Sequence, residues 1–256
     1  MTRTSPAGTG GGEDDGVRLD DPDLVRCEYE TENGLSARWS VYRELTGLTA
    51  PEVAFRAVEE VSPDRMLEVG CGWGDFSARV AAELGVSVVA VDLSPRMVEL
   101  ARERGVDARV GDVQALPFAD AEFDCAAANW MLYHVPDLDR GLAELARVLR
   151  PGARLVAATN GLQHLGELWA LVGRDRAAEP VRFFAETAEP FLRRHFETVE
   201  PRPVEKTVVF PDAAAVRHYI ASSVAHKHLA DTVPAFDGAF ATTSRQTVFV
   251  CEKTRG

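Results

Sequence analysis

The stretch Leu67-Glu68-Val69-Gly70-Cys71-Gly72-Trp73-Gly74-Asp75 decides the fold of this chain. Three glycines at alternate positions follow a short apolar run, and a segment with apolar residues at helical spacing follows them. A strand that ends in such a turn lets a ligand lie against bare backbone, because no Cβ atoms hold it away. Since open α/β sheets bind nucleotides at the carboxyl ends of their strands, the turn predicts a site for an adenosine-like ligand.

Around this stretch, short apolar runs alternate with amphipathic segments from about residue 62 to residue 159. The pattern predicts strands at 66–69, 87–91, 107–110, 123–128 and 154–158, and helices at 75–84, 95–104 and 138–149. Strands that alternate with helices of this length form a parallel sheet with helices on both faces. The remainder is less regular, with helices expected at 163–171, 188–194 and 212–222 and extended segments at 196–200, 207–210 and 247–251.

The composition is typical of one globular α/β domain. Hydrophobic residues make up 46% of the 256 residues, and no run approaches the roughly 20 apolar residues that cross a bilayer. Residues 1–22 are mostly Gly, Thr, Ser, Pro and acidic residues, so we expect a disordered tail there. We expect residues 23–256 to form a single domain.

Charge and cysteine spacing limit the partners. The formal net charge of -12 disfavours nucleic acid, because a protein that grips phosphate backbones needs clustered Lys and Arg. The four cysteines lie far apart without a C-x-x-C pair, which argues against a zinc site or a disulfide scaffold and fits reduced thiols. We therefore expect a cytoplasmic protein, monomeric or homodimeric, that binds a small molecule but no metal, nucleic acid or membrane.

Two common glycine-rich motifs do not fit the turn. A P-loop needs G-x-x-x-x-G-K-S/T, and no such Lys and Ser/Thr pair follows these glycines. A dinucleotide turn needs G-x-G-x-x-G, whose third glycine falls on Asp75 when counted from Gly70 and on Ser77 when counted from Gly72. The missing glycine, and a carboxylate facing a pyrophosphate, disfavour NAD and FAD. The pattern that fits is E-x-G-x-G-x-G, whose acidic neighbourhood suits a ligand without phosphate.

The whole pattern resembles that of a class I S-adenosylmethionine-dependent methyltransferase of the small-molecule type. The matching segments are 67–74, Asp92 at the end of the second expected strand, 111–118 (GDVQALPF), 123–129 (FDCAAAN) and the helix-to-strand crossing at 145–152. The resemblance is strong over roughly residues 63–159 and looser beyond them. It implies a Rossmann-like, seven-stranded, mostly parallel sheet with helices on both faces and an antiparallel last strand.

The resemblance also implies S-adenosylmethionine as the cofactor and assigns its contacts. Asp92 would accept hydrogen bonds from the ribose hydroxyls, although an NAD site would use it in the same way. Asp112 would accept from the adenine amine, and Glu68 would meet glycine-turn amides or the cofactor's ammonium group. The expected cofactor-binding residues are Glu68, Gly70, Cys71, Gly72, Gly74, Asp92, Leu93, Met97, Asp112, Val113 and Asn129.

Several of these residues have a structural alternative, and for Asp92 it is an N-cap or turn aspartate. The glycines could form a tight turn without a ligand, and Asp112 could be an ordinary turn residue. Glu68 could lie at the edge of a strand, and Met97 could pack in the core.

Methyl transfer is an in-line displacement at a sulfonium methyl, with a neutral thioether as the leaving group. Catalysis therefore depends mainly on holding the acceptor close and in line, and a base helps where the acceptor is a hydroxyl. His134 is the first candidate base because the unperturbed pKa of histidine is ~6.5, although a structural role is the alternative. His164, which follows the fifth expected strand, is a weaker candidate. The other histidines, among them His226, receive no role.

The acceptor side is less defined. No D/N-P-P-Y/F motif follows the fourth expected strand, which disfavours a nucleobase or protein side chain as acceptor. Aromatic residues gather around this end, and the expected substrate-binding residues are Arg38, Trp39, Tyr42, Trp130 and Tyr133, with core packing or a surface ion pair as the alternative for each. We expect residues 29–42 to fold as a helix over the cofactor and residues 161–237 to form a lid.

The expected function is methyl transfer from S-adenosylmethionine to a small organic acceptor, with a hydroxyl group of a specialised metabolite favoured. Transfer to carbon or nitrogen is the first alternative. A module that binds the cofactor without catalysis is the second. A nicotinamide oxidoreductase is a third, which Asp75 disfavours.

Overall fold

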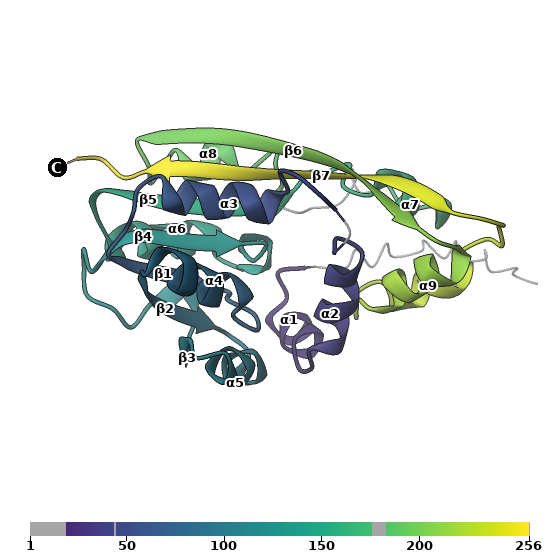
Figure 1. Ribbon diagram of the computed structural model, residues 1–256, viewed down its shortest axis with the longest axis horizontal. Helices are drawn as coiled ribbons and strands as arrows, with labels where there is room; N and C mark the ends of the chain where they lie inside the picture. The colour runs from purple at the N-terminus through teal and green to yellow at the C-terminus, as the bar shows by residue number, and fades with distance from the viewer. Residues whose placement is uncertain (1–18, 44, 176–182, 256) are drawn as a thin grey trace, which may run out of the picture.

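The computed structural model describes residues 19–43, 45–175 and 183–255. Within these residues, seven strands form one sheet in the order β3-β2-β1-β4-β5-β7-β6 (Figure 1). The strands are β1 (Arg65–Val69), β2 (Ser87–Asp92), β3 (Asp107–Val110), β4 (Phe123–Asn129), β5 (Leu149–Asn160), β6 (Thr198–Phe210) and β7 (Phe240–Glu252).

Strand direction follows the expected pattern. β1 to β5 pair in parallel, and β7 pairs antiparallel with both β5 and β6. β7 is therefore the one strand of this sheet that runs against the others. The mostly parallel, seven-stranded sheet with an antiparallel last strand is confirmed.

The α-helices are α1 (Pro22–Glu28), α2 (Asn33–Ser40), α3 (Ala50–Glu59), α4 (Asp75–Leu84), α5 (Pro95–Glu103), α6 (Leu138–Val148), α7 (Gly166–Leu171), α8 (Glu189–Leu192) and α9 (Ala213–Ala221). Short 3-10 helices follow β3, β4 and α9: η1 (Val113–Ala115), η2 (Leu132–His134) and η4 (Lys227–Thr232). The sequence signals for α5 are confirmed, since Pro95 occupies its first position and Ser94 Oγ accepts from the Met97 amide.

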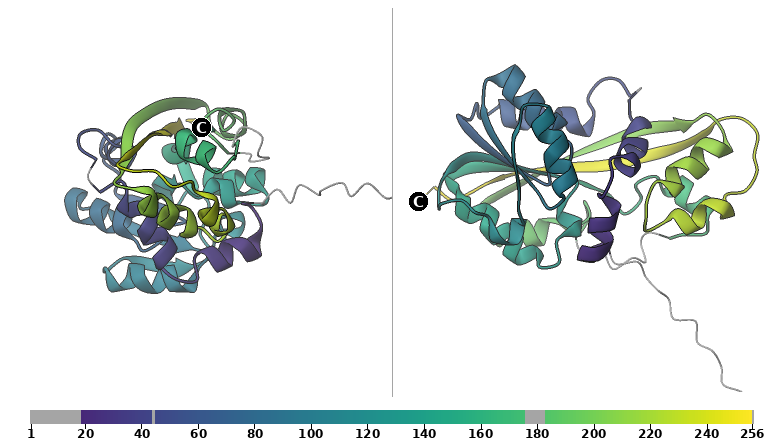
Figure 2. Two further views of the ribbon diagram at one scale, coloured as in Figure 1. Left: turned by 90° about the vertical axis from the view of Figure 1, so that its right-hand side faces the viewer. Right: turned by 90° about the horizontal axis from the view of Figure 1, so that it is seen from below.

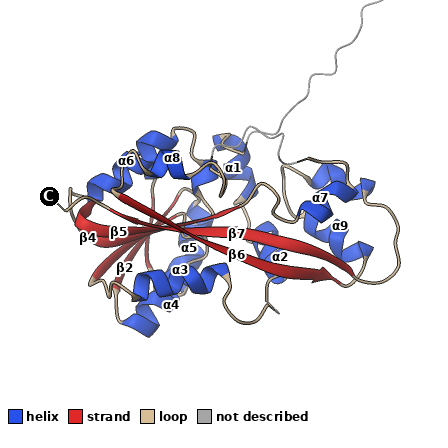
Figure 3. Ribbon diagram, turned by 90° about the horizontal axis from the view of Figure 1, so that it is seen from above, coloured by secondary structure: helices blue, strands red, loops and turns tan. Residues whose placement is uncertain are grey.

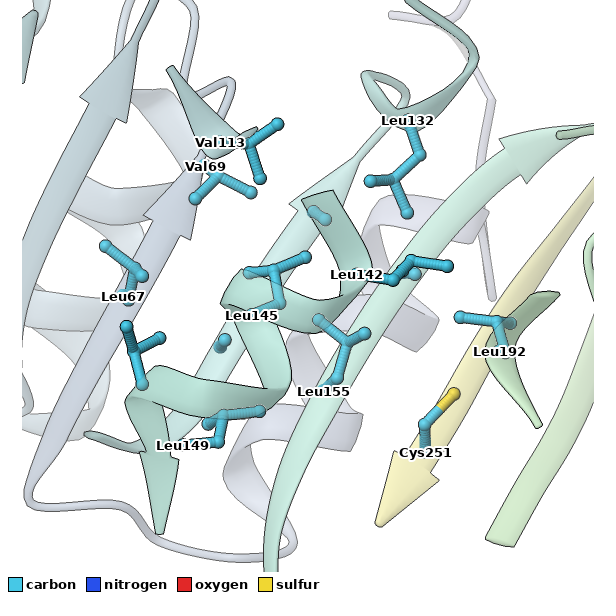
Figure 4. Packing of buried hydrophobic residues seen from close by; sticks show 14 of the residues in the cluster. Leu67, Val69, Val113, Leu132, Leu142, Leu145, Leu149, Leu155, Leu192 and Cys251 are labelled. Atoms are coloured by element: carbon cyan, nitrogen blue, oxygen red, sulfur yellow. The ribbon is translucent and has the colours of Figure 1, made fainter. Parts of the chain in front are cut away.

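Helices cover both faces of the sheet (Figure 3). Leu67 and Val69 of β1 pack in one cluster with residues of α6 and α8, and Figure 4 shows them near Leu145. Met66 belongs to the opposite cluster, with α3 and Val80 of α4. Neighbouring strand residues point to opposite faces, so the apolar residues Met66, Leu67 and Val69 of β1 reflect burial on both sides.

β6 differs from the expectation of two separate extended segments. Residues 198–200 and 207–210 belong to one strand, Thr198–Phe210, which pairs with β7 along its whole length, and residues 196–197 precede it. Pro201 and Pro203 interrupt the β pattern in the sequence. A proline cannot donate to a neighbouring strand, but β6 lies at the edge of the sheet, where this is tolerated.

A helical cap lies beyond the carboxyl ends of the parallel strands. We use this name for α1, α2, α7, α9 and η4. β6 and β7 extend past the rest of the sheet, and α7 and α9 pack on their far ends, while α1 and α2 lie between the core and α9 (Figures 1 and 2). The range 161–237, expected to be a lid, thus includes β6, which is part of the sheet.

The N-terminal boundary also differs in detail. Residues 1–18 of the expected tail lie outside the described residues. Asp21 caps α1 by accepting from the Asp23 and Leu24 amides, so Pro22 belongs to α1 rather than to the tail. In the described part of the chain, no helix is long and apolar enough to cross a membrane.

Candidate functional site

The glycine turn joins β1 to α4 and adopts a backbone that disfavours side chains. Gly70, Gly72 and Gly74 have φ values of +64°, +53° and +83°. A Cβ on Gly70 would lie 2.6 Å from Met131 Cβ, and one on Gly74 would lie 2.8 Å from Ala101 Cβ. Glycine is therefore required at both positions by conformation and by space.

Asp92, at the end of β2, lies directly beside this turn. Its carboxylate accepts from the Gly72 amide at 2.9 Å and from the Ser94 amide at 2.9 Å. Burial raises the pKa of Asp92, and the amide hydrogen bonds oppose that shift. Each oxygen has a second lone pair, so the fixed carboxylate can still accept from the hydroxyls of a ribose.

Glu68 has a partner that the sequence did not indicate. Glu68 is 2% exposed, and its carboxyl group accepts a hydrogen bond from the hydroxyl of Ser77 in the first turn of α4. Burial raises the pKa of Glu68 to about 8. The structure thus gives this carboxyl group a role in joining β1 to α4, beside the expected contact with a cofactor.

The segment after β3 shows the turn geometry that was the alternative for Asp112. Its carboxylate accepts from the Gln114 backbone amide at 2.8 Å and from the Gln114 side chain at 3.0 Å and 3.1 Å. Next to it, Leu93 and Val110 are large apolar side chains that remain 42% and 53% exposed. Leu93 directly follows β2, and Val110 ends β3. The two side chains therefore offer an uncovered apolar surface suited to a flat ring such as adenine. Val110 was not identified from the sequence.

Asn129, Met97 and Cys71, which were also expected to bind the cofactor, lie in three different environments. Asn129 ends β4, and neither polar atom of its buried side-chain amide has a hydrogen-bond partner among the described residues. An orphaned buried amide is costly, by about 1–3 kcal/mol, so a ligand group is a natural partner. Met97 is fully buried. Burial raises the pKa of the Cys71 thiol, so Cys71 is not a nucleophile at neutral pH.

These observations fit S-adenosylmethionine. The bare turn, the fixed Asp92 carboxylate, the exposed Leu93 and Val110 and the orphaned Asn129 amide lie at the carboxyl ends of β1, β2, β3 and β4. No group of three His, Cys, Asp or Glu side chains within the described ranges is placed to hold a metal ion.

The N-terminal helices cover this edge of the sheet. Ser94 Oγ donates to the Tyr29 carbonyl at 2.8 Å, and Arg96 pairs with Glu32 at 3.3 Å. Leu35 of α2 lies 3.4 Å from the position that a Cβ on Gly72 would occupy. The expectation of a helix above the cofactor turn therefore agrees with the position of α2.

A cavity of about 120 Å³ lies between the N-terminal helices, η2 and the α9–η4 segment. Arg38, Tyr133 and His134, three of the residues expected on the acceptor side, line it, and Tyr29 and His226 line it although the sequence indicated neither. The other expected substrate-binding residues do not line it. Trp39 packs instead against Trp130 and Tyr42, with ring centroids 5.5 Å and 6.1 Å apart.

His134 is held in one protonation state by two hydrogen bonds. Its Nδ1 lies 2.7 Å from the Leu19 carbonyl oxygen, and its Nε2 lies 3.1 Å from the Tyr29 hydroxyl. A carbonyl only accepts, so Nδ1 carries the proton and Nε2 accepts from Tyr29. Burial lowers the pKa of His134 to about 4 and raises that of Tyr29 to about 12. The ring is thus neutral at pH 7, with its lone pair on Nε2.

His164 has the same bonding pattern at another place. Its Nδ1 lies 3.0 Å from the Arg245 carbonyl and its Nε2 lies 3.0 Å from the Tyr42 hydroxyl. It is 3% exposed and does not line the cavity. These contacts favour a structural role and make His164 a poor candidate for the base.

Arg38 and His226 complete the polar lining of the cavity. Arg38 forms a buried ion pair with Glu28, rather than the surface ion pair considered from the sequence. His226 lies with Nδ1 3.1 Å from Ser223 Oγ. Sequence spacing alone gave no reason to select His226, because Trp169, whose ring packs against it, comes from a distant segment.

Comparison with known proteins supports this assignment. A family model described as a methyltransferase domain matches residues 67–157. Malonyl-acyl-carrier-protein O-methyltransferase of Serratia marcescens is 37% identical over 118 residues, which cover 44% of this chain and 46% of that protein. The 27-O-demethylrifamycin SV methyltransferase of Amycolatopsis mediterranei is 41% identical over 100 residues, which cover 36% and 37% of the two chains. The chain therefore spans less than half the length of these relatives.

Solved structures share the fold. A possible histamine N-methyltransferase of Thermotoga maritima aligns with a TM-score of 0.57 at 23% identity, covering 89% of this chain and 99% of that one. A phosphoethanolamine N-methyltransferase of Haemonchus contortus, solved with S-adenosylhomocysteine, aligns with a TM-score of 0.60 at 17% identity, covering 93% and 61%. The two solved structures, both below 25% identity, show the shared fold. The family match shows that the chain carries a methyltransferase domain at residues 67–157, whose motifs and glycine turn are those of the class I S-adenosylmethionine-dependent type.

Proposed function

We propose that the protein transfers a methyl group from S-adenosylmethionine to a hydroxyl of a small organic acceptor bound in the cavity. The observation that carries the proposal is the neutral His134 at the cavity wall, with its lone pair directed to the Tyr29 hydroxyl. Relatives named as O-methyltransferases support transfer to oxygen. Because the matches cover less than half of those proteins, the acceptor of this chain is a proposal of its own.

The glycine turn, Asp92 and Asn129 would hold the cofactor, which when bound supplies a methyl group on a sulfonium with a neutral leaving group. Tyr29 and His134 serve the acceptor. As the hydroxyl oxygen forms its bond to the methyl carbon, its proton moves to Tyr29 Oη, and the Tyr29 proton moves to His134 Nε2. The cofactor's thioether would leave as a neutral group, and the Leu19 carbonyl continues to accept from Nδ1 of the charged ring.

Binding and transfer are tested separately. Calorimetry with S-adenosylhomocysteine should show binding by the wild-type protein and by His134→Gln. Transfer of a radiolabelled methyl group is then measured on a panel of phenols, catechols, hydroxy acids, amines and malonyl thioesters. We expect a hydroxyl oxygen to be methylated, and His134→Gln to lower kcat by about 100-fold or more, in the range of general-base catalysis.

Other outcomes separate the alternatives. Methylation of amines alone would assign the protein to N-methyltransferases. Binding without transfer to any member of the panel would favour a non-catalytic module. Near-normal turnover by His134→Gln would remove this residue as the base.

We further propose a single-domain cytoplasmic protein, monomeric or dimeric, in which α7, α9 and η4 serve as the lid over the acceptor. The four cysteines support that location: all are free, and Cys71, Cys125 and Cys251 are buried within the core.

A further inference from the structure

Glu28 and Arg38 form the most enclosed ion pair in the described part of the chain. Glu28 ends α1 and Arg38 lies in α2, with side chains only 9% and 20% exposed. The other ion pairs described each include a side chain that is more than 30% exposed. Burial of two charges is unfavourable unless each also has hydrogen-bond partners.

The helical cap has two halves: α1 and α2 form one, and α7, α9 and η4 form the other. Glu28 and Arg38 belong to the first half, and their hydrogen-bond partners come from the second. Arg38 Nη1 donates to the Ser222 carbonyl at 2.9 Å, and the Val224 amide donates to Glu28 Oε2 at 2.6 Å. Ser222 is the C-cap of α9. The carbonyls at a helix C-terminus lack intrahelical donors and carry the negative end of the dipole, so a guanidinium is favoured there.

A glycine in α2 provides independent evidence for this docking. A Cβ on Gly34 would lie 2.5 Å from the Ser222 carbonyl oxygen. Gly34 lies within α2 and has an ordinary negative φ, so backbone conformation does not require glycine there. Glycine also weakens a helix relative to alanine. The close approach of α2 to the end of α9 is therefore the reason for glycine at this position.

We propose that Glu28, Arg38 and Gly34 form a latch that holds the two halves of the helical cap closed over the cofactor turn and the acceptor cavity. Glu28 and Arg38 line the cavity, and so does Ser223, which lies between their partners Ser222 and Val224. Leu35 of the same helix lies on Gly72 of the cofactor turn. Exchange of cofactor and acceptor then requires the latch to open. This inference rests on the proposed function, because it places the cofactor beneath α2.

Dissociation of S-adenosylhomocysteine from the full chain tests the latch. Stopped-flow displacement is measured for wild type, Arg38→Met and Gly34→Ala. The control is Arg26→Met, which removes an exposed ion pair with Asp23 from α1. We expect both latch variants to release the ligand at least about tenfold faster, since each breaks buried contacts between the halves, and the control to match wild type. Hydrogen exchange at residues 222–226 should also be faster in both latch variants.

Gly34→Ala gives the sharpest outcome, because alanine would otherwise strengthen α2. Unchanged or slower release, with unchanged exchange at 222–226, would overturn the latch. If Arg38→Met unfolds, as seen by circular dichroism, Gly34→Ala decides alone. If wild type does not bind S-adenosylhomocysteine, the proposed function fails instead. Exchange at 222–226 then still decides whether the two halves are coupled.

Discussion

Replacing Gly70 with alanine tests the packing of the glycine turn most directly. Gly70 has a φ of +64°, and the left-handed region costs a residue with a Cβ about 1–2 kcal/mol. The new methyl group would also lie 2.6 Å from Met131 Cβ and 2.7 Å from Met131 Cγ, far inside ordinary contact. Overpacking of this kind costs about 1–3 kcal/mol. The free energy of unfolding should therefore fall by roughly 2–5 kcal/mol.

Gly85 provides a matched control. It has a φ of +71° at the C-cap of α4, and no described atom lies within 4 Å of the position of its Cβ. Gly85→Ala should therefore lose only the conformational part, about 1–2 kcal/mol. The entropy that alanine removes from the unfolded chain is the same in both variants, so it cancels in the comparison.

Urea unfolding and calorimetry with S-adenosylhomocysteine measure the two effects. Gly70→Ala should be less stable than Gly85→Ala by about 1–3 kcal/mol and should bind the ligand more weakly. Gly85→Ala should keep wild-type affinity. Equal losses of stability in the two variants would refute the argument that close packing against Met131 requires glycine.

Three further substitutions test the charged and titrating groups. Asp92→Asn should weaken binding of S-adenosylhomocysteine by about 10- to 100-fold in calorimetry. The reason is that the amide nitrogen of the new asparagine would face the backbone N–H groups that now donate to Asp92. Wild-type affinity of the variant would argue against a ribose contact. Burial holds the pKa of His134 at about 4, below its value in the unfolded chain. Protons therefore bind the unfolded chain preferentially, and the free energy of unfolding falls as the pH drops from about 6.5 to 4. His134→Gln should lack that part of the loss, at most about 3 kcal/mol, in urea unfolding at several pH values. The pH dependence of stability due to Glu68 has the opposite sign. Its pKa of about 8 lies above the value in the unfolded chain, so its contribution to stability declines as the pH rises from about 4.5 to 8. Glu68→Gln should therefore be more stable than wild type by roughly 2–4 kcal/mol at pH 8 but not at pH 5; a uniform change at both would contradict the shifted pKa.

The sheet and the cofactor side were predictable because their signals are local. Apolar periodicity places the strands from β1 to β4, and the alternate glycines mark the turn at the end of β1. Asp92 follows the next strand, and the carboxyl ends of neighbouring parallel strands meet at one edge of the sheet. Sequence reasoning could therefore bring Asp92 to Gly72, which lie 20 positions apart and are joined by a hydrogen bond.

Local patterns failed where chain neighbours do not determine the environment. The prolines of β6 read as a break, because the sequence does not show that this strand lies at an edge of the sheet. Asp112 received a ligand role from the resemblance, and the sequence did not indicate that its carboxylate also accepts hydrogen bonds from Gln114. Trp39, Tyr42 and Trp130 were expected on the acceptor side, with core packing as the alternative, and the structure packs Trp39 against the other two rings.

By itself, the sequence determined the order of the strands and helices, the glycine turn and the carboxylate beside it, since spacing along one segment specifies these features. The tertiary structure alone decided the contacts around the cavity. Tyr29 meets His134 across 105 positions, and Arg38 meets Ser222 across 184. Such contacts depend on how α1, α2 and α9 dock together, and side-chain burial and hydrogen-bond direction at those junctions exist only once the chain has folded.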